Sequence, residues 1–453
     1  VGNAGGRCQA GSRGADQTPG RHPEYHSEHP GKKKKKRAAE GIKIRVLLDK
    51  SITVIEMDEY FAKFMKEAGI QVAFHHRAID PSSAQFRTHR KILAIDNKEA
   101  ITGGRNIGDD YFDIDPVYNF LDRDVYIEGP IVQALWDSFD AFWKHRSVLI
   151  AKDPKPTHRL GMFRGNRRNQ ERYLNVRMTQ HVRRLEEGRE FVENMDGIEE
   201  YSKRIEEVAR PILDATKVHV CPQVTYISDQ PGGNVMTRMR SDYKPKWRVT
   251  RKEIFDRLYK SAVEGNEVIL VSPYFMLNSD WSDVIGNMLD RNTKVKVYTN
   301  SLGSTDAFYV SANFYRIIFD WQKRGLIPYI HDSGYAGITD VVDPSIEKTR
   351  WGVHSKTHIY DEDSLYIGTY NIDNRSDFYN AEMGIFCDGN KELVSELKAN
   401  IERRLDQAYE IVGDMKAIDE NGQEADVYGN ASEKNIKIMK AIKLPSWLFE
   451  PLM

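Results

Sequence analysis

Two stretches of this 453-residue chain share one pattern, THRKILAID at residues 88–96 and VHSKTHIYD at residues 353–361. In each, a His is followed two residues later by a Lys and seven residues later by an Asp. The motif residues are His89, Lys91 and Asp96 in the first copy and His354, Lys356 and Asp361 in the second. Composition alone produces one such pattern in roughly one chain of twenty of this length. Two copies therefore indicate a duplicated unit.

An Asn recurs with the pattern. It stands seventeen residues after each His, as Asn106 in GGRNIGD and Asn371 in GTYNIDNRS. Each copy also reads as a hairpin, because an apolar β-branched run is followed by turn residues and then by a second apolar run. The return strand is expected to bring each Asn back beside its His and Lys. This arrangement predicts one site shared between two lobes.

Strand geometry divides the motif residues into two groups. Side chains two residues apart on a strand share a face, so each His projects together with its Lys. Asp96 and Asp361 have the opposite parity and begin the turns. We therefore predict that they complete the catalytic motif as turn or supporting residues, without touching the substrate.

Two imidazoles, two ammonium groups and two amides around one point suit a phosphodiester. Lysine and amide N–H groups hold the non-bridging oxygens, where charge builds in the transition state. One neutral His can attack phosphorus, and the other can protonate the leaving oxygen and then act as base for the incoming hydroxyl. This chemistry requires no metal, and we expect no cofactor.

The alternative for any single His on a strand is a packed or surface residue. The duplication favours catalysis for His89 and His354. His358 shares the face of His354 but has no partner in the first copy, so a structural role is favoured for it.

The chain resembles the phospholipase D superfamily, and within it bacterial cardiolipin synthases. The resemblance covers roughly Ala38 to Leu405. It rests on HRKILAIDNKEAITGGRNIGDDYF, VSPYF, YTNSLGSTDAF and HSKTHIYDEDSLYIGTYNIDNRSDFYNAEMG. It implies an α/β fold of two pseudo-symmetric phospholipase D-type lobes, each a mixed sheet flanked by helices, with the active site between them. It also implies transfer of a phosphatidyl group between alcohols through a phosphohistidine intermediate.

The resemblance also assigns roles. His89 and His354 match the nucleophile and acid pair, with the first His as the usual attacker. The phosphate-binding positions match Lys91, Lys356, Asn106 and Asn371.

The family further places a carboxylate behind the imidazole. Glu382 in NAEMG fits this position. Aligning FLDRDVYIEG with YNAEMGIF sets Asp124 opposite Glu382 and Asp122 opposite Asn380. Glu382 and Asp124 are therefore expected to support the histidines, the alternative being solvated strand ends.

The charge composition indicates which classes of substrate the chain can bind. Residues 1–40 hold nine Lys/Arg and four Asp/Glu, which leaves 57 basic against 63 acidic residues and a net charge of −6 for the rest. Proteins that grip a nucleic acid backbone are more often basic. We therefore expect phospholipid substrates at a membrane surface and no nucleic acid.

The expected location is the cytoplasmic side of a bacterial cell or the periphery of its inner membrane. Cys8, Cys221 and Cys387 are widely spaced and show neither metal spacing nor a disulfide framework, which favours a reducing compartment. No apolar run reaches the ~18 residues that span a bilayer. A lipid substrate would be met from the membrane surface.

The lobes repeat beyond the motif and suggest domain boundaries. KIRVLLDKS (43–51) matches KVKVYTNSL (294–302), and each begins a strand, helix and strand that lead into the catalytic hairpin. The expected domains are a first lobe at 38–150, a helical insertion or linker at 151–250, a second lobe at 251–410 and a C-terminal segment at 411–453.

The first lobe is expected to be incomplete at its N-terminus. The second lobe opens with the strand EVILVSPYF and the helix DWSDVIGNMLDR, but residues 1–37 are rich in Gly, Arg and Pro and end in GKKKKKR. We expect these residues to be a disordered or non-native tail. The favoured explanation is a reading-frame error at the Lys run, and a native basic tail is the alternative.

The C-terminal IKIMKAIKLPSWLFEPLM alternates Lys with apolar residues. It is expected either to lie in a membrane interface or to form a terminal helix packed on the second lobe.

Four functions remain open at this stage. The first is a cardiolipin synthase-type phosphatidyltransferase, and the second is a phospholipase D-type hydrolase with water as acceptor. The third is a nuclease of the same superfamily, which the net charge disfavours. The fourth is an inactive remnant that keeps the motifs.

Overall fold

The structure is a computed structural model that describes residues 4–13, 41–50, 57–75, 86–153, 178–186, 203, 206–207, 211, 216–231, 248–334, 344–405 and 407–443. The chain forms two compact units. The larger contains residues 1–17, 88–141 and 211–453, and the smaller contains residues 18–87 and 142–210.

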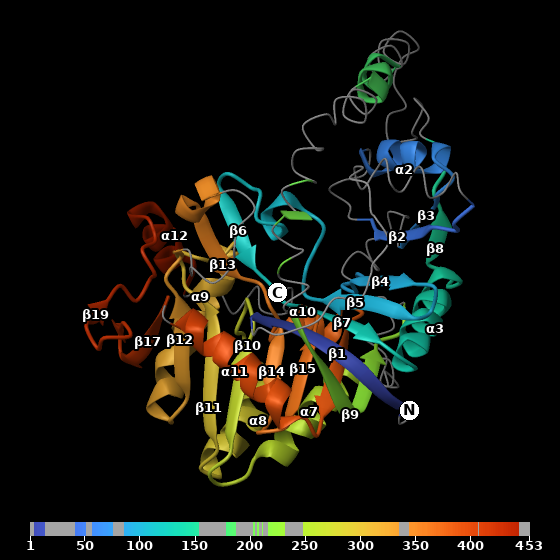
Figure 1. Cartoon of the computed structure of the whole chain (residues 1–453). Coiled ribbons are helices and arrows are strands. Elements are labelled where there is room, and N and C mark those ends of the chain that lie inside the picture. The colour runs from blue at the N-terminus through green and yellow to red at the C-terminus, as the bar shows by residue number, and fades with distance from the viewer. Residues whose placement is uncertain are drawn as a thin grey trace, which may run out of the picture. The chain divides into compact units, whose positions relative to one another are not determined.

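A mixed sheet runs through the larger unit (Figure 1), with fourteen strands among the described residues. From edge to edge they are β19 (Glu424–Ala425), β18 (Lys416–Ile418), β17 (Ala408–Gly413), β12 (Ile327–His331), β11 (Lys294–Asn300), β10 (Glu267–Val271), β14 (Thr357–Ile359), β15 (Ser364–Gly368), β16 (Met383–Asp388), β9 (Thr216–Ser228), β1 (Ala4–Arg13), β7 (Asp124–Glu128), β5 (Glu99–Gly103) and β4 (Ile92–Ile95). Strands β10, β11 and β12 are mutually parallel, and the other neighbours are antiparallel.

Two smaller sheets accompany it. The smaller unit holds a sheet in the order β2 (Arg45–Asp49), β3 (Gln71–His75) and β8 (Val148–Ile150), and the larger unit holds the parallel pair β6 (Tyr118–Leu121) and β13 (Arg350–Val353). The described helices are α2 (Met57–Glu67), α3 (Ile131–Trp143), α7 (Val249–Ser261), α8 (Ser279–Asp290), α9 (Phe308–Lys323), α10 (Asn374–Phe378), α11 (Lys391–Leu405) and α12 (Glu433–Lys443). Two short 3₁₀ helices are η2 (Asp109–Tyr111) and η4 (Pro344–Lys348).

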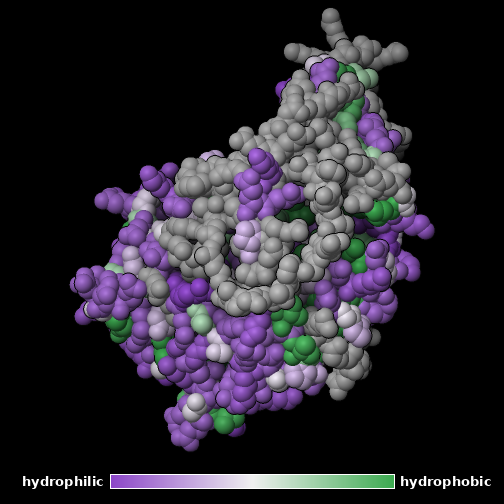
Figure 2. All heavy atoms as spheres, viewed as in Figure 1, coloured by the Kyte–Doolittle hydropathy of each residue, from purple (hydrophilic) through white to green (hydrophobic). Residues whose placement is uncertain are grey.

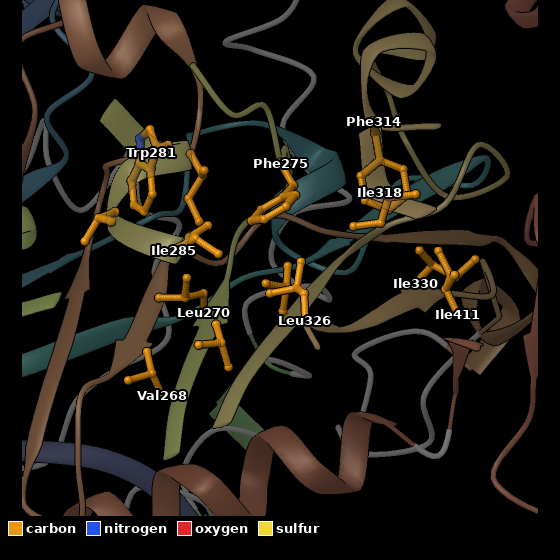
Figure 3. Packing of buried hydrophobic residues seen from close by; sticks show 14 of the residues in the cluster. Val268, Leu270, Phe275, Trp281, Ile285, Phe314, Ile318, Leu326, Ile330 and Ile411 are labelled. Atoms are coloured by element: carbon orange, nitrogen blue, oxygen red, sulfur yellow. The ribbon is translucent and has the colours of Figure 1, made fainter. Parts of the chain in front are cut away.

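The core of the second lobe lies on both faces of β10. This strand is a continuous apolar run because it is buried on both faces, as parallel strands usually are. Val268 and Leu270 pack with α8 and α9 on one face, as Figure 3 shows. Ile269 and Val271 pack with the apolar side of α11 on the other, and Figure 1 shows α11 lying across the strands. This packing holds β14 in place, and Lys356 immediately precedes that strand.

The two lobes repeat the same elements. The strands β2, β3, β4, β5, β7 and β8 of the first lobe correspond to β11, β12, β14, β15, β16 and β17 of the second, and α2 and α3 correspond to α9 and α11. In the second lobe β10 joins β11 to β14. Among the described residues of the first lobe, β10 and α8 have no counterpart. Here β2 and β4 belong to different sheets, and each ends its sheet.

Strand β1 departs from the expectation for the N-terminal tail. Residues 4–13 pair antiparallel with both β7 and β9 inside the large sheet. Strands β7 and β9 each present an edge at this point, and any extended backbone can pair with such an edge. The side-chain pattern of residues 4–13 therefore did not predict β1, because the strand is held in the sheet by main-chain hydrogen bonds. The rest of the expected tail, residues 14–37, lies outside the described residues.

A disulfide corrects a second expectation. Cys221 on β9 and Cys387 on β16 form a disulfide with a Cα–Cα distance of 5.7 Å. Strands β9 and β16 are neighbours in the sheet, although 166 residues separate the two cysteines. Sequence spacing could not reveal this pairing, and the argument for a reducing compartment loses its basis, because disulfides persist in oxidising compartments.

The surface offers no spanning segment among the described residues, since none of their helices combines the length and apolar character that crossing a membrane requires. The face of the larger unit in Figure 2 is mostly hydrophilic. Helix α12 packs on α9, with Met439 buried and Ile436 and Ile442 against the core. Its apolar side therefore faces the second lobe. Residues 444–453 lie outside the described residues.

Candidate active site

Two tight hairpins carry the motif residues. The first hairpin closes through the three residues 96–98, in which Asp96 and Asn97 have φ angles of 49° and 55° and the Lys98 amide donates to the Ile95 carbonyl at 3.0 Å. Asp361 lies at the corresponding turn, where its carboxylate accepts a hydrogen bond from the Asp363 amide at 3.0 Å. Both motif aspartates are thus turn residues in the structure.

His89 is held by groups from the second lobe. Its Nδ1 lies 2.9 Å from Glu382 Oε2 and 2.9 Å from the carbonyl oxygen of Thr369. Its side chain keeps 21% of its surface exposed, whereas Glu382 is fully buried. A carboxylate on Nδ1 fixes the tautomer and leaves Nε2 for chemistry.

Three neighbours support Glu382. The hydroxyl of Thr369 donates to Oε2 at 2.5 Å, and the hydroxyl of Ser376 donates to Oε1 at 2.8 Å. Asp229, at the end of β9, accepts from the Glu382 amide at 3.0 Å. The Asp229 amide in turn donates to the Glu382 carbonyl at 2.8 Å. The carboxylate therefore has little freedom to turn away from His89.

His354 is held by the first lobe in the same way. Its Nδ1 lies 2.6 Å from Asp122 Oδ2. The rings of Tyr111 and Phe120 flank the imidazole, with centroid distances of 4.9 and 5.0 Å. Lys356 Nζ lies 3.0 Å from Nε2 of His354. The second imidazole is therefore more enclosed than the first.

Backbone pairing explains why each carboxylate serves the His of the other lobe. Strand β13 runs parallel to β6 with Val353 opposite Leu121, so His354 follows one strand as Asp122 follows the other. An isolated parallel bridge joins Thr88 and Ala381 in the same manner. The residue after each bridge is a His on one side and a carboxylate on the other.

This arrangement corrects the assignment of Asp124. The sequence alignment put Asp124 in the supporting position, but Asp124 binds Arg105, with Nε to Oδ2 at 2.6 Å. The strand register shows the error, because Gly103 pairs with Asp124 as Gly368 pairs with Gly384. Asp122 is therefore the counterpart of Glu382. A loop between return strand and carboxylate that is longer in the first lobe hid this correspondence.

The phosphate-binding positions are placed as follows. Lys91 Nζ donates to the His89 carbonyl at 2.7 Å. Asn106 Nδ2 donates to the Tyr111 hydroxyl at 2.8 Å. Asn371 is buried, and its Oδ1 makes no hydrogen bond. Each motif Lys thus lies beside its own His, whereas Asn106 reaches Tyr111, whose ring packs on His354 of the other lobe.

Known proteins share this arrangement of sequence. The family model described as "Cardiolipin synthase, PLD-like domain" matches residues 32–143 and 255–405. The chain belongs to this family. It is an enzyme family of the phospholipase D superfamily, and the observed α/β fold of two lobes agrees with it.

Relatives of this phospholipase D-like chain match most of its length. A Helicobacter pylori (strain ATCC 700392 / 26695) protein without a functional name is 23% identical over 398 residues, which are 83% of this chain and 71% of that protein. Cardiolipin synthase C of Escherichia coli (strain K12) is 24% identical over 409 residues, or 83% and 76%. Phosphatidylserine synthase of Haemophilus influenzae Rd KW20 shares the fold, with a TM-score of 0.55 and 12% identity over 90% of this chain and 83% of that one.

Burial sets the charge state of this phospholipase D-like site at rest. It lowers the pKa of His89, although Glu382 opposes the shift. It also lowers the pKa of His354 to about 3 and that of Lys356 to about 8. Burial raises the pKa of Glu382, but His89, the Thr369 hydroxyl and the Lys91 charge outweigh it and lower the value to about 2. Both imidazoles are therefore neutral at pH 7, and the carboxylate behind His89 is ionised.

The two motif copies also act on each other. Lys356 contributes to the lowered pKa of His89, and Lys91 contributes to that of His354. Charge effects of this kind require that the groups lie within a few ångströms to about ten ångströms of one another. The two hairpins therefore form one electrostatic site.

Sequence reasoning missed Asp229 and the role of Thr369. Asp229 precedes Gln-Pro-Gly-Gly and reads as a turn residue. Thr369 occupies the position of Gly104 in the first lobe, where a Cβ atom would lie 2.3 Å from Asp122 Oδ1. A hydroxyl meets the longer Glu382, and a glycine leaves room for the shorter Asp122. The sequence signal that could have identified the two carboxylates is this match of Thr369 with Glu382 and of Gly104 with Asp122.

Proposed function

We propose that this chain is a phosphatidyltransferase of cardiolipin synthase type. The observation that carries the proposal is the crossed pair of His–carboxylate contacts, His89 with Glu382 and His354 with Asp122, each beside a motif lysine. Family membership and the likeness to cardiolipin synthase C over 83% of the chain support the same reaction class.

The first half of the proposed reaction loads a histidine. Nε2 of His89 attacks the phosphorus of a phospholipid donor, and the bond from phosphorus to the leaving alcohol oxygen breaks. That oxygen takes a proton from His354, which the incoming anionic phosphate has helped to protonate. We assign the attack to His89 because its side chain is 21% exposed, against 6% for His354. Glu382 stabilises the positive charge that develops on the His89 ring.

The second half transfers the phosphatidyl group to an alcohol. His354, now neutral, takes the proton of a lipid hydroxyl such as that of phosphatidylglycerol. The hydroxyl oxygen forms the new bond to phosphorus, and the bond to His89 breaks. Lys91, Lys356 and the amides of Asn106 and Asn371 hold the non-bridging oxygens throughout. The reaction needs no metal at any step.

The test uses vesicles of phosphatidylglycerol labelled in its phosphate. The full chain is expected to form a lipid with two phosphates and to release glycerol, at a rate that excess chelator leaves unchanged. His89→Ala and His354→Ala should each lower turnover by at least ~10²-fold, since general acid–base and nucleophilic groups act as a unit. His358→Gln is the matched control, because His358 lies two residues from Lys356 on the same strand but its Nδ1 meets Tyr360 at 3.2 Å.

Quenching in alkali should trap an acid-labile phosphoryl label on His89. Label on a serine, or no label on protein during turnover, would contradict the covalent step. Phosphatidic acid as the main product would identify water as the acceptor and the chain as a hydrolase.

A further inference from the structure

The VSPYF and YTNSLGSTDAF motifs meet beside the catalytic pair without taking part in the steps above. Tyr274 belongs to the first motif and Asp306 to the second. The Tyr274 hydroxyl donates to both carboxylate oxygens of Asp306, at 3.0 and 3.1 Å. Asp306 is exposed, and Tyr274 is its one hydrogen-bond partner among the described residues. The remaining lone pairs of this carboxylate are free to accept hydrogen bonds.

Tyr274 ties this pair to the second phosphate-binding Asn. The next residue, Phe275, forms a parallel bridge with Ile372, and the Met276 amide donates to the Ile372 carbonyl at 2.9 Å. Asn371 immediately precedes this bridge. Tyr274 also packs against Ala307 and Val310 at the start of α9. The tyrosine is therefore fixed between Asn371 and the loop that carries Asp306.

The other end of the loop is tied to His354. Asn300 Oδ1 accepts from the Val353 amide at 2.7 Å and from the Ser304 hydroxyl at 3.0 Å. The Tyr118 hydroxyl donates to the Ser304 carbonyl at 2.5 Å. Asp306 follows two residues later. The loop thus spans from the residue before His354 to the tyrosine beside Asn371.

Charge effects agree with this placement. Burial lowers the pKa of Lys356 and Asp306 opposes that shift, whereas for Tyr111, in the other lobe, burial raises the pKa and Asp306 adds to the rise. The charge of Asp306 therefore acts on residues of both lobes.

The charges around Asp306 and Tyr274 indicate which kind of ligand can bind there. A carboxylate repels the phosphate that the lysines attract, so Asp306 marks the uncharged part of a substrate. The Lys356 ammonium nearby disfavours a second cation at the same place. An uncharged polyol satisfies both conditions, because its hydroxyl groups donate to the free oxygens of Asp306.

We propose that Asp306, oriented by Tyr274, forms the acceptor subsite and accepts a hydrogen bond from the second hydroxyl of a vicinal diol, as in a glycerol headgroup, while the neighbouring hydroxyl attacks phosphorus. This inference rests on the proposed function and names a specificity residue for it. Hydrogen bonds to charged groups change affinity by roughly ten- to a hundredfold.

The experiment compares acceptors over one donor. Phosphatidylglycerol vesicles are supplied with radiolabelled glycerol or with 1-propanol, which lacks the second hydroxyl, and kcat/KM is measured for each alcohol. A second arm follows the two-phosphate lipid that forms when phosphatidylglycerol itself is the acceptor. Asp306→Asn and Tyr274→Phe are compared with Asp320→Asn, an exposed residue on the same helix as Phe308.

In Asp306→Asn the preference for glycerol over 1-propanol should fall about tenfold or more, with a smaller fall in Tyr274→Phe and none in Asp320→Asn. A parallel loss in the second arm assigns the subsite to the lipid headgroup, and a loss confined to free glycerol assigns it to a soluble polyol. An unchanged preference in Asp306→Asn overturns the inference but leaves the transferase intact. Absence of any transfer by the unaltered chain overturns the proposed function itself.

Discussion

Single residues decide how each imidazole works, and Asp122 and Asp124 provide a direct comparison. They lie two residues apart, yet Asp122 contacts His354 at 2.6 Å and Asp124 contacts Arg105. Asp122→Asn should lower kcat by ~10²-fold or more, because an amide cannot stabilise imidazolium and can select the wrong tautomer. Asp124→Asn should lower kcat less than about tenfold. Steady-state rates on labelled vesicles measure both, and equal losses would refute the assignment of Asp122.

His358 makes a prediction about pH and stability. It is fully buried between Tyr360 and Tyr366, and burial lowers its pKa to about 3. The unfolded chain has the ordinary histidine pKa of ~6.5, so it binds the proton more tightly than the folded chain between these two pH values. Wild-type stability should therefore fall as pH drops below ~6.5.

His358→Gln removes this contribution. The difference in unfolding free energy between wild type and variant should shift in favour of the variant by roughly 1.4 kcal/mol per pH unit below ~6.5. Denaturant unfolding at pH 7.5, 6 and 5 measures it. A difference that is independent of pH would mean that His358 is not buried in its neutral form.

The sequence predicted the residues of the site better than their partners. Spacing singled out both histidines, both lysines and both asparagines as candidates, because a duplicated pattern can be recognised without coordinates. It also indicated a structural role for His358. It misassigned Asp124, because the partner of His354 is set by strand register across two lobes. Register is not visible to an alignment of short motifs.

Among the elements, β4 and β14 hold the same place in their lobes but differ in their neighbours. Strand β14 is paired on both sides, by β10 and β15, whereas β4 pairs with β5 and has no second neighbour among the strands that the structure describes. Leu93 and Ile95 of β4 are 55% and 50% exposed. Open edges of this kind are sites of association and of local opening.

Hydrogen exchange should separate the two strands. Amides of Ile92–Ile95 are expected to exchange much faster than those of Thr357–Ile359, although both strands follow a catalytic His. Mass spectrometry of peptic peptides measures this. Fusion of a copy of residues 267–290 ahead of residue 42 should slow exchange in β4 if a strand like β10 can pair there. Equal protection in the original chain would show that another segment covers the edge.

The elements were predictable where period and turn chemistry agreed. The strand and helix repeat at 43–51 and 294–302 predicted β2 and β11, and the turns after both motifs predicted the hairpins. Strand β1 was not predictable, since Gly-rich sequence carries no apolar alternation and its pairing depends on edges supplied by distant residues. The helix α12 was ambiguous because its apolar face suits either a membrane or a protein core.

For the whole molecule, the Cys221–Cys387 disulfide links β9, which lies within the expected insertion at 151–250, to β16 of the second lobe. Closing a loop of this length restricts the unfolded chain, and such bonds contribute about 2–5 kcal/mol. Reductant, or the double substitution of both cysteines by serine, should lower the Tm by several degrees in differential scanning calorimetry. The serine variant should not respond to reductant. A Tm that reductant leaves unchanged would show that the bond does not form in solution.

The His–carboxylate contacts between the two lobes have a consequence for how the duplicated chain evolves. A chain that arose by doubling one half would ordinarily be free to let one copy decay, but here each half holds the histidine of the other in working order. A change at Asp122 is felt at His354, and a change at Glu382 is felt at His89. Each His and its carboxylate are therefore expected to vary together, although they lie in different halves of the chain. In this respect the two halves resemble the subunits of an obligate dimer.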